Sequence, residues 1–150
     1  MSLADEELRN PADAFLASVL KSGPSPWPGS LDAGDGWERI AYHGIAPLLH
    51  AHPALTEGWP AAVAGKVREE AIAHAFWEDS HRHAVGRAVR MLGEAGVATV
   101  VMKGTALAYS LYDDPSLRPR GDSDILVRCS AARASGVFDK TFWSTHTSHR

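Results

Sequence analysis

Cysteine is almost missing from this sequence, since Cys129 is the only one among 150 residues. A single thiol cannot form an internal disulfide, and this excludes a secreted scaffold held together by disulfides. No stretch of about 18 apolar residues occurs, so we expect no membrane span. The first ten residues lack the basic and apolar regions of a signal peptide, and we therefore expect a cytoplasmic protein.

An excess of positive charge is missing as well. The chain carries 15 Lys and Arg residues against 18 Asp and Glu residues, a formal net charge of -3 at pH 7. General binding to nucleic acid depends on a basic surface, so this balance predicts none. With 45% hydrophobic and 22% charged residues, the composition is typical of a globular protein, and the length suits one domain.

The N-terminal two thirds of the chain has the patterns of helices and loops. Asn10 followed by Pro11 is typical of a helix start, and the Gly- and Pro-rich residues 22–36 predict a loop. Residues 61–95 are rich in Ala, Glu and Arg and contain no Pro, which predicts one long helix. Two shorter helices are expected between these segments, from Asp35 to His43 and from Pro47 to His50.

The C-terminal third predicts a small sheet. Residues 97–102 form a continuous apolar run rich in β-branched side chains, which favours a buried strand. Residues 123–128 predict a second strand beside the first, and residues 105–112 predict the helix that joins them. The expected fold class is α/β, more narrowly α+β, with a helical N-terminal half and a small, incomplete sheet. The expected segments within this one domain are 1–36, 37–96 and 97–150.

Two carboxylates stand directly before the apolar residues of the second strand. Asp122 and Asp124 are two residues apart, and a strand directs such positions to the same face. Carboxylates beside a buried strand are costly unless a partner compensates them, and hard divalent cations such as Mg²⁺ prefer carboxylate oxygens. We therefore expect a metal site at this pair; a solvated turn or a helix cap is the alternative.

A second candidate feature is the Lys103-Gly104-Thr105 sequence at the start of the joining helix. Glycine lets the backbone approach a phosphate, and amides at a helix start favour an anion. The Thr105 hydroxyl could add a donor and Lys103 could reach a triphosphate, whereas an ordinary tight turn with a solvated lysine is the alternative. Arg118 and Arg120 could bind phosphate or neutralise the acidic pair.

The long helix carries His74, Glu78 and His81 at spacings that place them on one face and would permit a zinc site. The sequence pattern of a His-Glu-x-x-His protease is absent. We therefore interpret these three residues as a polar helix face rather than as metal ligands.

Several of these stretches together resemble a known family. Met102–Ala108 (MKGTALA), Leu117–Pro119 (LRP) and Gly121–Val127 (GDSDILV) are similar to the uncharacterised nucleotidyltransferase family. That family belongs to the DNA-polymerase-β-like nucleotidyltransferase superfamily. The resemblance is specific over residues 97–127 and looser back to Trp37.

The resemblance implies an enzyme that transfers a nucleoside monophosphate from a nucleoside triphosphate to an acceptor that the sequence does not identify. It implies Mg²⁺ or Mn²⁺ as the cofactor, with Asp122 and Asp124 as catalytic residues that hold the metal. The nucleotide-binding residues that it implies are Lys103, Gly104, Thr105 and Arg118.

The end of the chain fits this family less well. Members of the superfamily have a third carboxylate on a later strand, and Asp139 is the only acidic residue after Asp124, in a context that does not match. Residues 137–147 have strand-like composition. We expect a chain truncated or frameshifted after Arg128, with weak or absent transfer activity and an open sheet edge that favours a homo-oligomer.

Two other functions are compatible with the sequence. One is a non-catalytic module that binds a nucleotide or a metal, and the missing third carboxylate favours it over a complete enzyme. The other is a protein-interaction accessory of a toxin–antitoxin or biosynthetic system, in which the helical half binds a partner.

Overall fold

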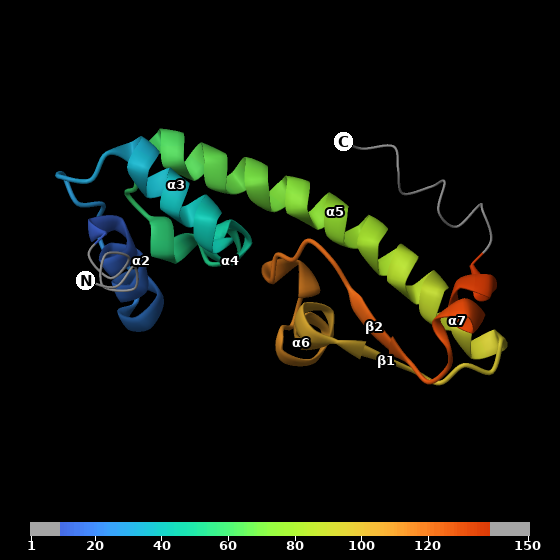
Figure 1. Ribbon diagram of the computed structural model, residues 1–150. Coiled ribbons are helices and arrows are strands. Elements are labelled where there is room, and N and C mark those ends of the chain that lie inside the picture. The colour runs from blue at the N-terminus through green and yellow to red at the C-terminus, as the bar shows by residue number, and fades with distance from the viewer. Residues whose placement is uncertain (1–9, 139–150) are drawn as a thin grey trace, which may run out of the picture. The chain divides into compact units, whose positions relative to one another are not determined.

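The computed structural model describes residues 10–138, and their contacts separate into two compact units. The first unit comprises the described residues up to Phe76 together with Asp114–Pro119. The second comprises Trp77–Asp113 and the described residues from Arg120 onward. The boundary lies inside helix α5 (Ala61–Glu94; Figure 1), whereas the segments expected from the sequence divide after residues 36 and 96.

The first unit is helical. Its helices begin and end at residues with clear local signals: Asn10 caps α2 by accepting a hydrogen bond from the Ala12 amide at 2.9 Å. Asp32 caps α3, which therefore begins before the predicted Asp35. Gly44, at a φ of 62°, ends α3 as predicted. The elements are α2 (Pro11–Ser22), α3 (Ala33–His43), α4 (Ala46–Ala51), the first half of α5, and the 3₁₀ turns η1 (Pro53–Thr56) and η2 (Pro115–Leu117).

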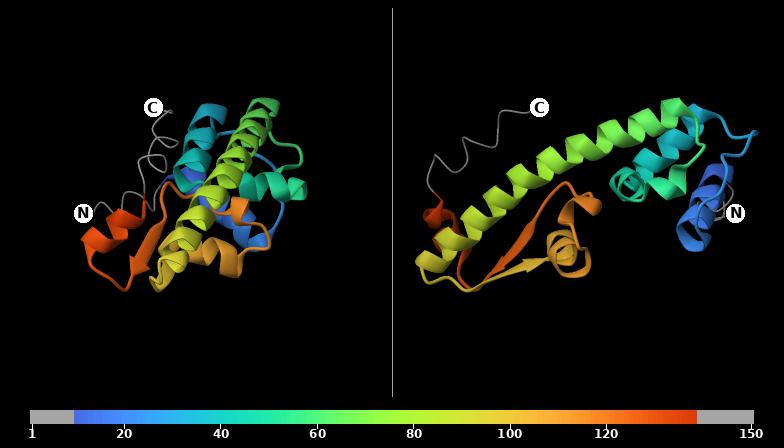
Figure 2. Two further views of the ribbon diagram at one scale, coloured as in Figure 1. Left: turned by 90° about the vertical axis from the view of Figure 1, so that its right-hand side faces the viewer. Right: turned by 180° about the vertical axis from the view of Figure 1, so that it is seen from behind.

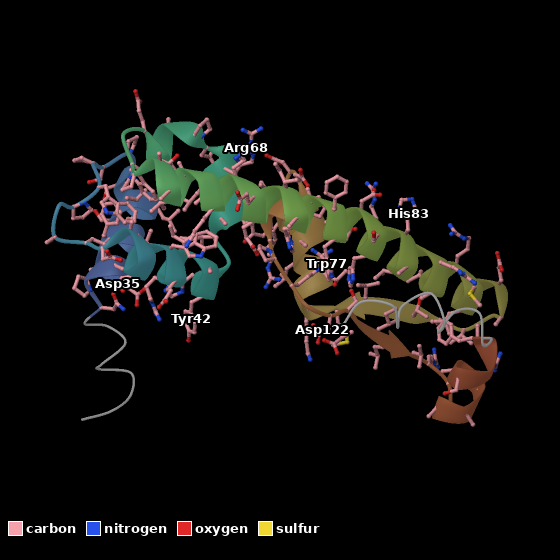
Figure 3. The ribbon with its side chains drawn as sticks, turned by 90° about the horizontal axis from the view of Figure 1, so that it is seen from above. Asp35, Tyr42, Arg68, Trp77, His83 and Asp122 are labelled. Carbon is pink, nitrogen blue, oxygen red and sulfur yellow. The ribbon has the colours of Figure 1, made fainter. Side chains whose placement is uncertain are left out.

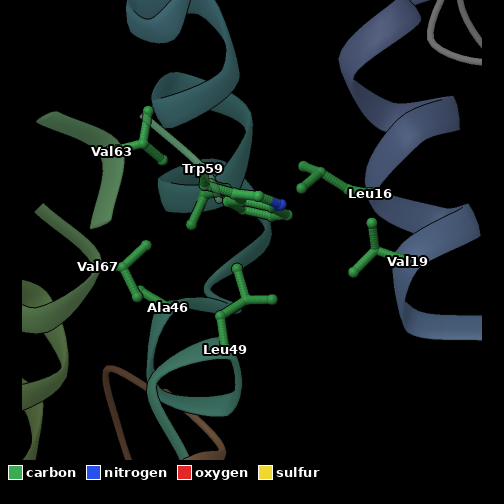
Figure 4. Packing of buried hydrophobic residues seen from close by; sticks show 8 residues of the cluster. Leu16, Val19, Ala46, Leu49, Trp59, Val63 and Val67 are labelled. Atoms are coloured by element: carbon green, nitrogen blue, oxygen red, sulfur yellow. The ribbon is translucent and has the colours of Figure 1, made fainter. Parts of the chain in front are cut away.

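An apolar core holds these helices together (Figure 4). The rings of Phe15, Trp27 and Trp59 pack against one another, with centroids 5.0–5.5 Å apart. Gly36 of α3 lies so close to the Trp27 ring that a Cβ atom there would be 2.3 Å from it. The buried members of the core are Leu16, Val19, Ile40, Ala46, Leu49, Trp59, Val63 and Val67.

The second unit contains the sheet. Strands β1 (Thr99–Met102) and β2 (Asp124–Val127) lie side by side and pair antiparallel (Figure 2). Helix α6 (Lys103–Leu111) lies between them in the chain and begins two residues earlier than predicted, and α7 (Ala131–Val137) follows β2. The two adjacent strands and their joining helix confirm the predicted α+β class. No helix within residues 10–138 is long and apolar enough to cross a membrane.

The prediction that the first strand is buried is wrong for one of its faces. Val100 and its partner Leu126 are each 59% exposed. Ile125 and Val127 instead line a cavity together with side chains of α5. A continuous apolar run identifies a strand but not how many of its faces are covered, and here α5 covers one face. The strand-like composition of 137–147 falls almost wholly outside the described residues.

Candidate functional site

The strand pairing brings the two candidate motifs together. Met102 is the Cα partner of Asp124, so the junction between β1 and α6 lies beside the start of β2. Lys103 follows Met102 directly, and its Nζ atom is 3.0 Å from Oδ2 of Asp124. The hydrogen bond to Asp124 and, more weakly, the charge of Asp122 raise the pKa of Lys103 above its usual value. The Lys103 ammonium therefore interacts with both carboxylates.

The acidic pair is not contained in one strand. Asp124 is the first residue of β2, whereas Asp122 precedes the strand and is exposed (Figure 3). Asp122 lines a cavity of about 650 Å³, but neither Asp124 nor Gly104 lines it. Side chains alternate along a strand, so Asp124 lies on the face opposite Ile125, which does line this cavity.

Lys103 has an unusual backbone conformation. Its φ is 51°, and it is the only non-glycine residue with positive φ within residues 10–138. A side chain in this region costs on the order of 1 kcal/mol, and such strained positions cluster at functional sites. The conformation lets α6 begin immediately after β1, without a loop. The first turn of α6, including Gly104 and Thr105, consequently starts beside Asp124.

The Thr105 side chain is buried and forms hydrogen bonds within the protein. Thr105 is 1% exposed. Its Oγ1 accepts a hydrogen bond from Nε of Arg120 at 3.1 Å and forms a second hydrogen bond with the Ser123 hydroxyl. A phosphate contact by this residue would therefore come from its backbone amide at the helix start rather than from its hydroxyl.

Arg120, just before the acidic segment in the chain, forms a buried ion pair with Glu78. The Arg120 side chain is 3% exposed and that of Glu78 is 8% exposed. One guanidinium nitrogen of Arg120 is 2.9 Å from Oε1 and 2.7 Å from Oε2 of Glu78. The Tyr109 hydroxyl donates a hydrogen bond to Oε1 at 2.7 Å. Partial burial and the adjacent Glu78 carboxylate raise the pKa of Tyr109 to about 12.

Sequence reasoning missed this pair. Interpreting Glu78 as part of a polar helix face is wrong, because the side chain is buried against Arg120. Arg120, which the sequence suggested as a partner of phosphate or of the acidic pair, forms a buried ion pair with Glu78. One signal could have found Glu78: it follows the buried Ala71 by seven residues, which is two helical turns, and so lies in phase with the apolar stripe.

The residues that could hold a metal are the two aspartates. Within residues 10–138 no group of three or more His, Cys, Asp and Glu side chains is arranged to bind a metal ion. His74, Glu78 and His81 do not make up such a group, and the Glu78 carboxylate contacts Arg120. Mg²⁺ in nucleotide sites is commonly held by one or two carboxylates together with substrate phosphates, and Asp122 and Asp124 fit that donor set. Asp139 lies outside the described residues.

The remaining candidate, Arg118, belongs to the first unit. It follows η2 in the segment Asp114–Pro119, which packs with α4. Lys103, Gly104, Thr105 and the two aspartates all belong to the second unit.

Comparisons with known proteins identify a family. Residues 30–147 match the family described as "Uncharacterised nucleotidyltransferase". The match extends well beyond residues 97–127, on which the motif resemblance rests, and includes most of the last 20 residues, which the motifs left unassigned. No curated protein and no solved structure matches the chain. The family supports a general nucleotidyltransferase-like function, and because the match covers more than half of the sequence, the chain belongs to the uncharacterised nucleotidyltransferase family.

Proposed function

We propose that this protein transfers a nucleoside monophosphate from a nucleoside triphosphate to an acceptor hydroxyl, with Mg²⁺ or Mn²⁺ as the cofactor. One observation carries the proposal: the junction of β1 and α6 and the acidic start of β2 are direct neighbours, joined by the contact of Lys103 with Asp124. The Lys103 cation, the helix start and the Asp124 carboxylate are neighbours there, and the charge of Asp122 also acts on Lys103, so this junction offers groups for both a triphosphate and its metal.

The proposed roles follow from this arrangement. Asp122 and Asp124 hold the metal through their carboxylate oxygens, which are at the surface of the second unit. The Lys103 ammonium and the amides of Gly104 and Thr105 contact triphosphate oxygens. We also propose Arg118 as a phosphate ligand, on the basis of the family resemblance alone.

The proposed reaction transfers a nucleoside monophosphate from the triphosphate to the acceptor hydroxyl. The acceptor hydroxyl gives its proton to a carboxylate of the acidic pair, and its oxygen forms a bond to the α-phosphorus. The bond from the α-phosphorus to the bridging oxygen of the β-phosphate breaks, and the electron pair leaves with pyrophosphate. The metal, when bound, supplies positive charge that stabilises the leaving pyrophosphate and the attacking oxygen.

Pyrophosphate release tests this proposal. The protein is incubated with each of the four nucleoside triphosphates, Mg²⁺ and a panel of hydroxyl acceptors such as glycerol, a hexose and a nucleoside. We expect slow release, because the sequence does not identify a third carboxylate, and we expect Asp124→Asn to reduce it by at least about a further hundredfold, because a metal ligand is lost. Asp79→Asn is the matched control, since Asp79 is an exposed residue of the same unit.

Two outcomes separate the alternatives. Metal-dependent binding of a triphosphate without pyrophosphate release would support the non-catalytic binding module. Neither binding nor release would leave the protein-interaction accessory as the better account and would overturn the proposal.

A further inference from the structure

The segment that carries the acidic pair has no regular backbone structure before β2 begins. Residues 121–123 are neither helical nor in the strand. Backbone hydrogen bonds of a sheet or helix therefore do not fix Asp122. The ion pair that Lys103 makes with Asp124 is exposed, and exposed ion pairs hold geometry weakly.

The side chains of Arg120 and Ser123, one on each side of Asp122 in the chain, instead bind residues inside the second unit. Arg120 is bound to Glu78 of α5 and to Thr105 of α6. The Ser123 hydroxyl forms one hydrogen bond with Thr105 and another with Nε2 of His81, at 2.7 Å. Residues on both sides of Asp122 thus connect the acidic segment to two helices.

Arginine is suited to this position by its shape. Its Nε binds Thr105 while a terminal nitrogen binds Glu78, so one guanidinium spans α6 and α5. The rings of Trp77 and Tyr109 lie near the guanidinium, with centroids 5.8 and 5.5 Å from Cζ (Figure 3 labels Trp77). A lysine ammonium is a single point charge and cannot make both contacts in the same geometry.

We propose that Arg120 is a positioning residue, which through its buried pair with Glu78 and its hydrogen bond to Thr105 holds the two metal-binding aspartates beside the phosphate-binding turn. The proposal rests on the proposed function for the roles of Asp122 and Asp124. It adds that the geometry of these carboxylates is set by an ion pair that touches neither the metal nor the nucleotide.

Two single variants and two matched controls test the proposal in the full chain. Arg120→Lys retains the charge but not the planar fork, and Glu78→Gln removes the buried carboxylate charge. The controls are Arg82→Lys and Asp79→Asn, which alter the exposed pair of Arg82 and Asp79 in the same stretch of α5. Mn²⁺ affinity is measured by electron paramagnetic resonance, and the order of the backbone amides of residues 121–124 is measured by NMR relaxation.

We expect both test variants to bind Mn²⁺ at least about tenfold more weakly than the wild type, as is usual when a residue that orients metal ligands is lost. Amides of residues 121–124 should become more mobile, and neither control should change either quantity. Folded test variants with wild-type Mn²⁺ affinity and unchanged amide order would overturn the proposal. If the wild type itself binds no Mn²⁺, the proposed function fails, while the amide measurement still decides the anchoring role.

A double variant separates positioning from simple loss of stability. Removing one partner leaves a buried unpaired charge, but Arg120→Met combined with Glu78→Leu removes both charges and is expected to recover stability. The double variant should therefore unfold at a temperature closer to that of the wild type than either Arg120→Met or Glu78→Leu alone. We expect its Mn²⁺ affinity to remain about tenfold weakened. Recovery of the wild-type affinity together with stability would show that the pair is only structural.

Discussion

The Lys103 ammonium lies 3.0 Å from the Asp124 carboxylate, at the point where β1 passes into α6 and β2 begins. Lys103 directly follows the last residue of β1, Met102, and Asp124, the first residue of β2, is the partner of Met102 in the sheet. The Lys103 ammonium therefore occupies a position where the negative charge of Asp124 would also attract a divalent metal ion.

Replacing Lys103 by methionine should change metal and nucleotide binding in opposite directions. Without the competing ammonium, we expect Mn²⁺ alone to bind a few-fold more tightly, a modest gain because exposed ion pairs are weak. Binding of a non-hydrolysable triphosphate with Mg²⁺ should become weaker, because a phosphate contact is lost. Titration calorimetry measures both. Lys66→Met, in the first unit, serves as the control, and a loss of both affinities would argue that Lys103 does not compete with the metal.

The cluster around Asp13 predicts a pH-dependent stability of the first unit. Both Asp13 oxygens are 2.7 Å from nitrogens of Arg39, and one is 2.9 Å from Nε2 of His43. The hydrogen bond from Arg39 is the largest cause that lowers the pKa of Asp13 below its ordinary value of 3.8. A lowered pKa means stabilisation that is fully present above the ordinary value and is lost as the pH falls through the lower, folded-state value.

We therefore expect Asp13→Asn to lower the thermal unfolding temperature by several degrees near neutral pH. The difference from the wild type should shrink as the pH falls below the ordinary pKa of Asp13. Thermal unfolding followed by tryptophan fluorescence at a series of pH values measures this. A difference that stayed constant down to the acid limit would mean that the charge of Asp13 is not what stabilises the fold.

Two glycine variants should have effects of opposite sign on unfolding. Gly36→Ala would place a Cβ atom 2.3 Å from the Trp27 ring, which Phe15 and Trp59 hold in place. We expect a loss of about 1–3 kcal/mol, the usual cost of overpacking. Gly65→Ala in α5 meets no atom within 4 Å and should stabilise the helix by up to about 1 kcal/mol. Denaturant unfolding of both variants gives the comparison.

The Tyr109 phenol should report on the buried ion pair. Its pKa is raised to about 12 by partial burial and by Glu78, so ionisation near 295 nm should begin above the range of an ordinary tyrosine. In Glu78→Gln the carboxylate charge is gone, and we expect the Tyr109 pKa to fall toward the ordinary value of 10.0. The signal is assigned by its loss in Tyr109→Phe. An unchanged titration in Glu78→Gln would indicate that Glu78 is not the partner of this phenol.

The features that the sequence predicted well depend on short-range signals. The Asn10 cap, the glycine end of α3 at Gly44, and the strands on either side of α6 each follow from a few neighbouring residues. The two strands were predicted as neighbours, and their pairing is what brings the Lys103 turn close to Asp124.

The features that could not be predicted depend on tertiary contacts. Arg120 and Glu78 are 42 residues apart, and nothing in the local sequence of either specifies the other as its partner. Glu78 could have been recognised as buried from its helical phase, but not as the partner of Arg120. Likewise, the exposure of Val100 depends on which face of β1 is covered, and an apolar run does not encode that choice.

The most direct test of the proposed site is the metal dependence of nucleotide binding. Thermal unfolding is measured with a non-hydrolysable triphosphate, with and without Mg²⁺, for the wild type, Asp124→Asn and the control Asp79→Asn. The proposed site predicts that the nucleotide raises the unfolding temperature of the wild type and the control only when Mg²⁺ is present, and that Asp124→Asn abolishes this increase. An equal increase in Asp124→Asn, or in the wild type without metal, would contradict it.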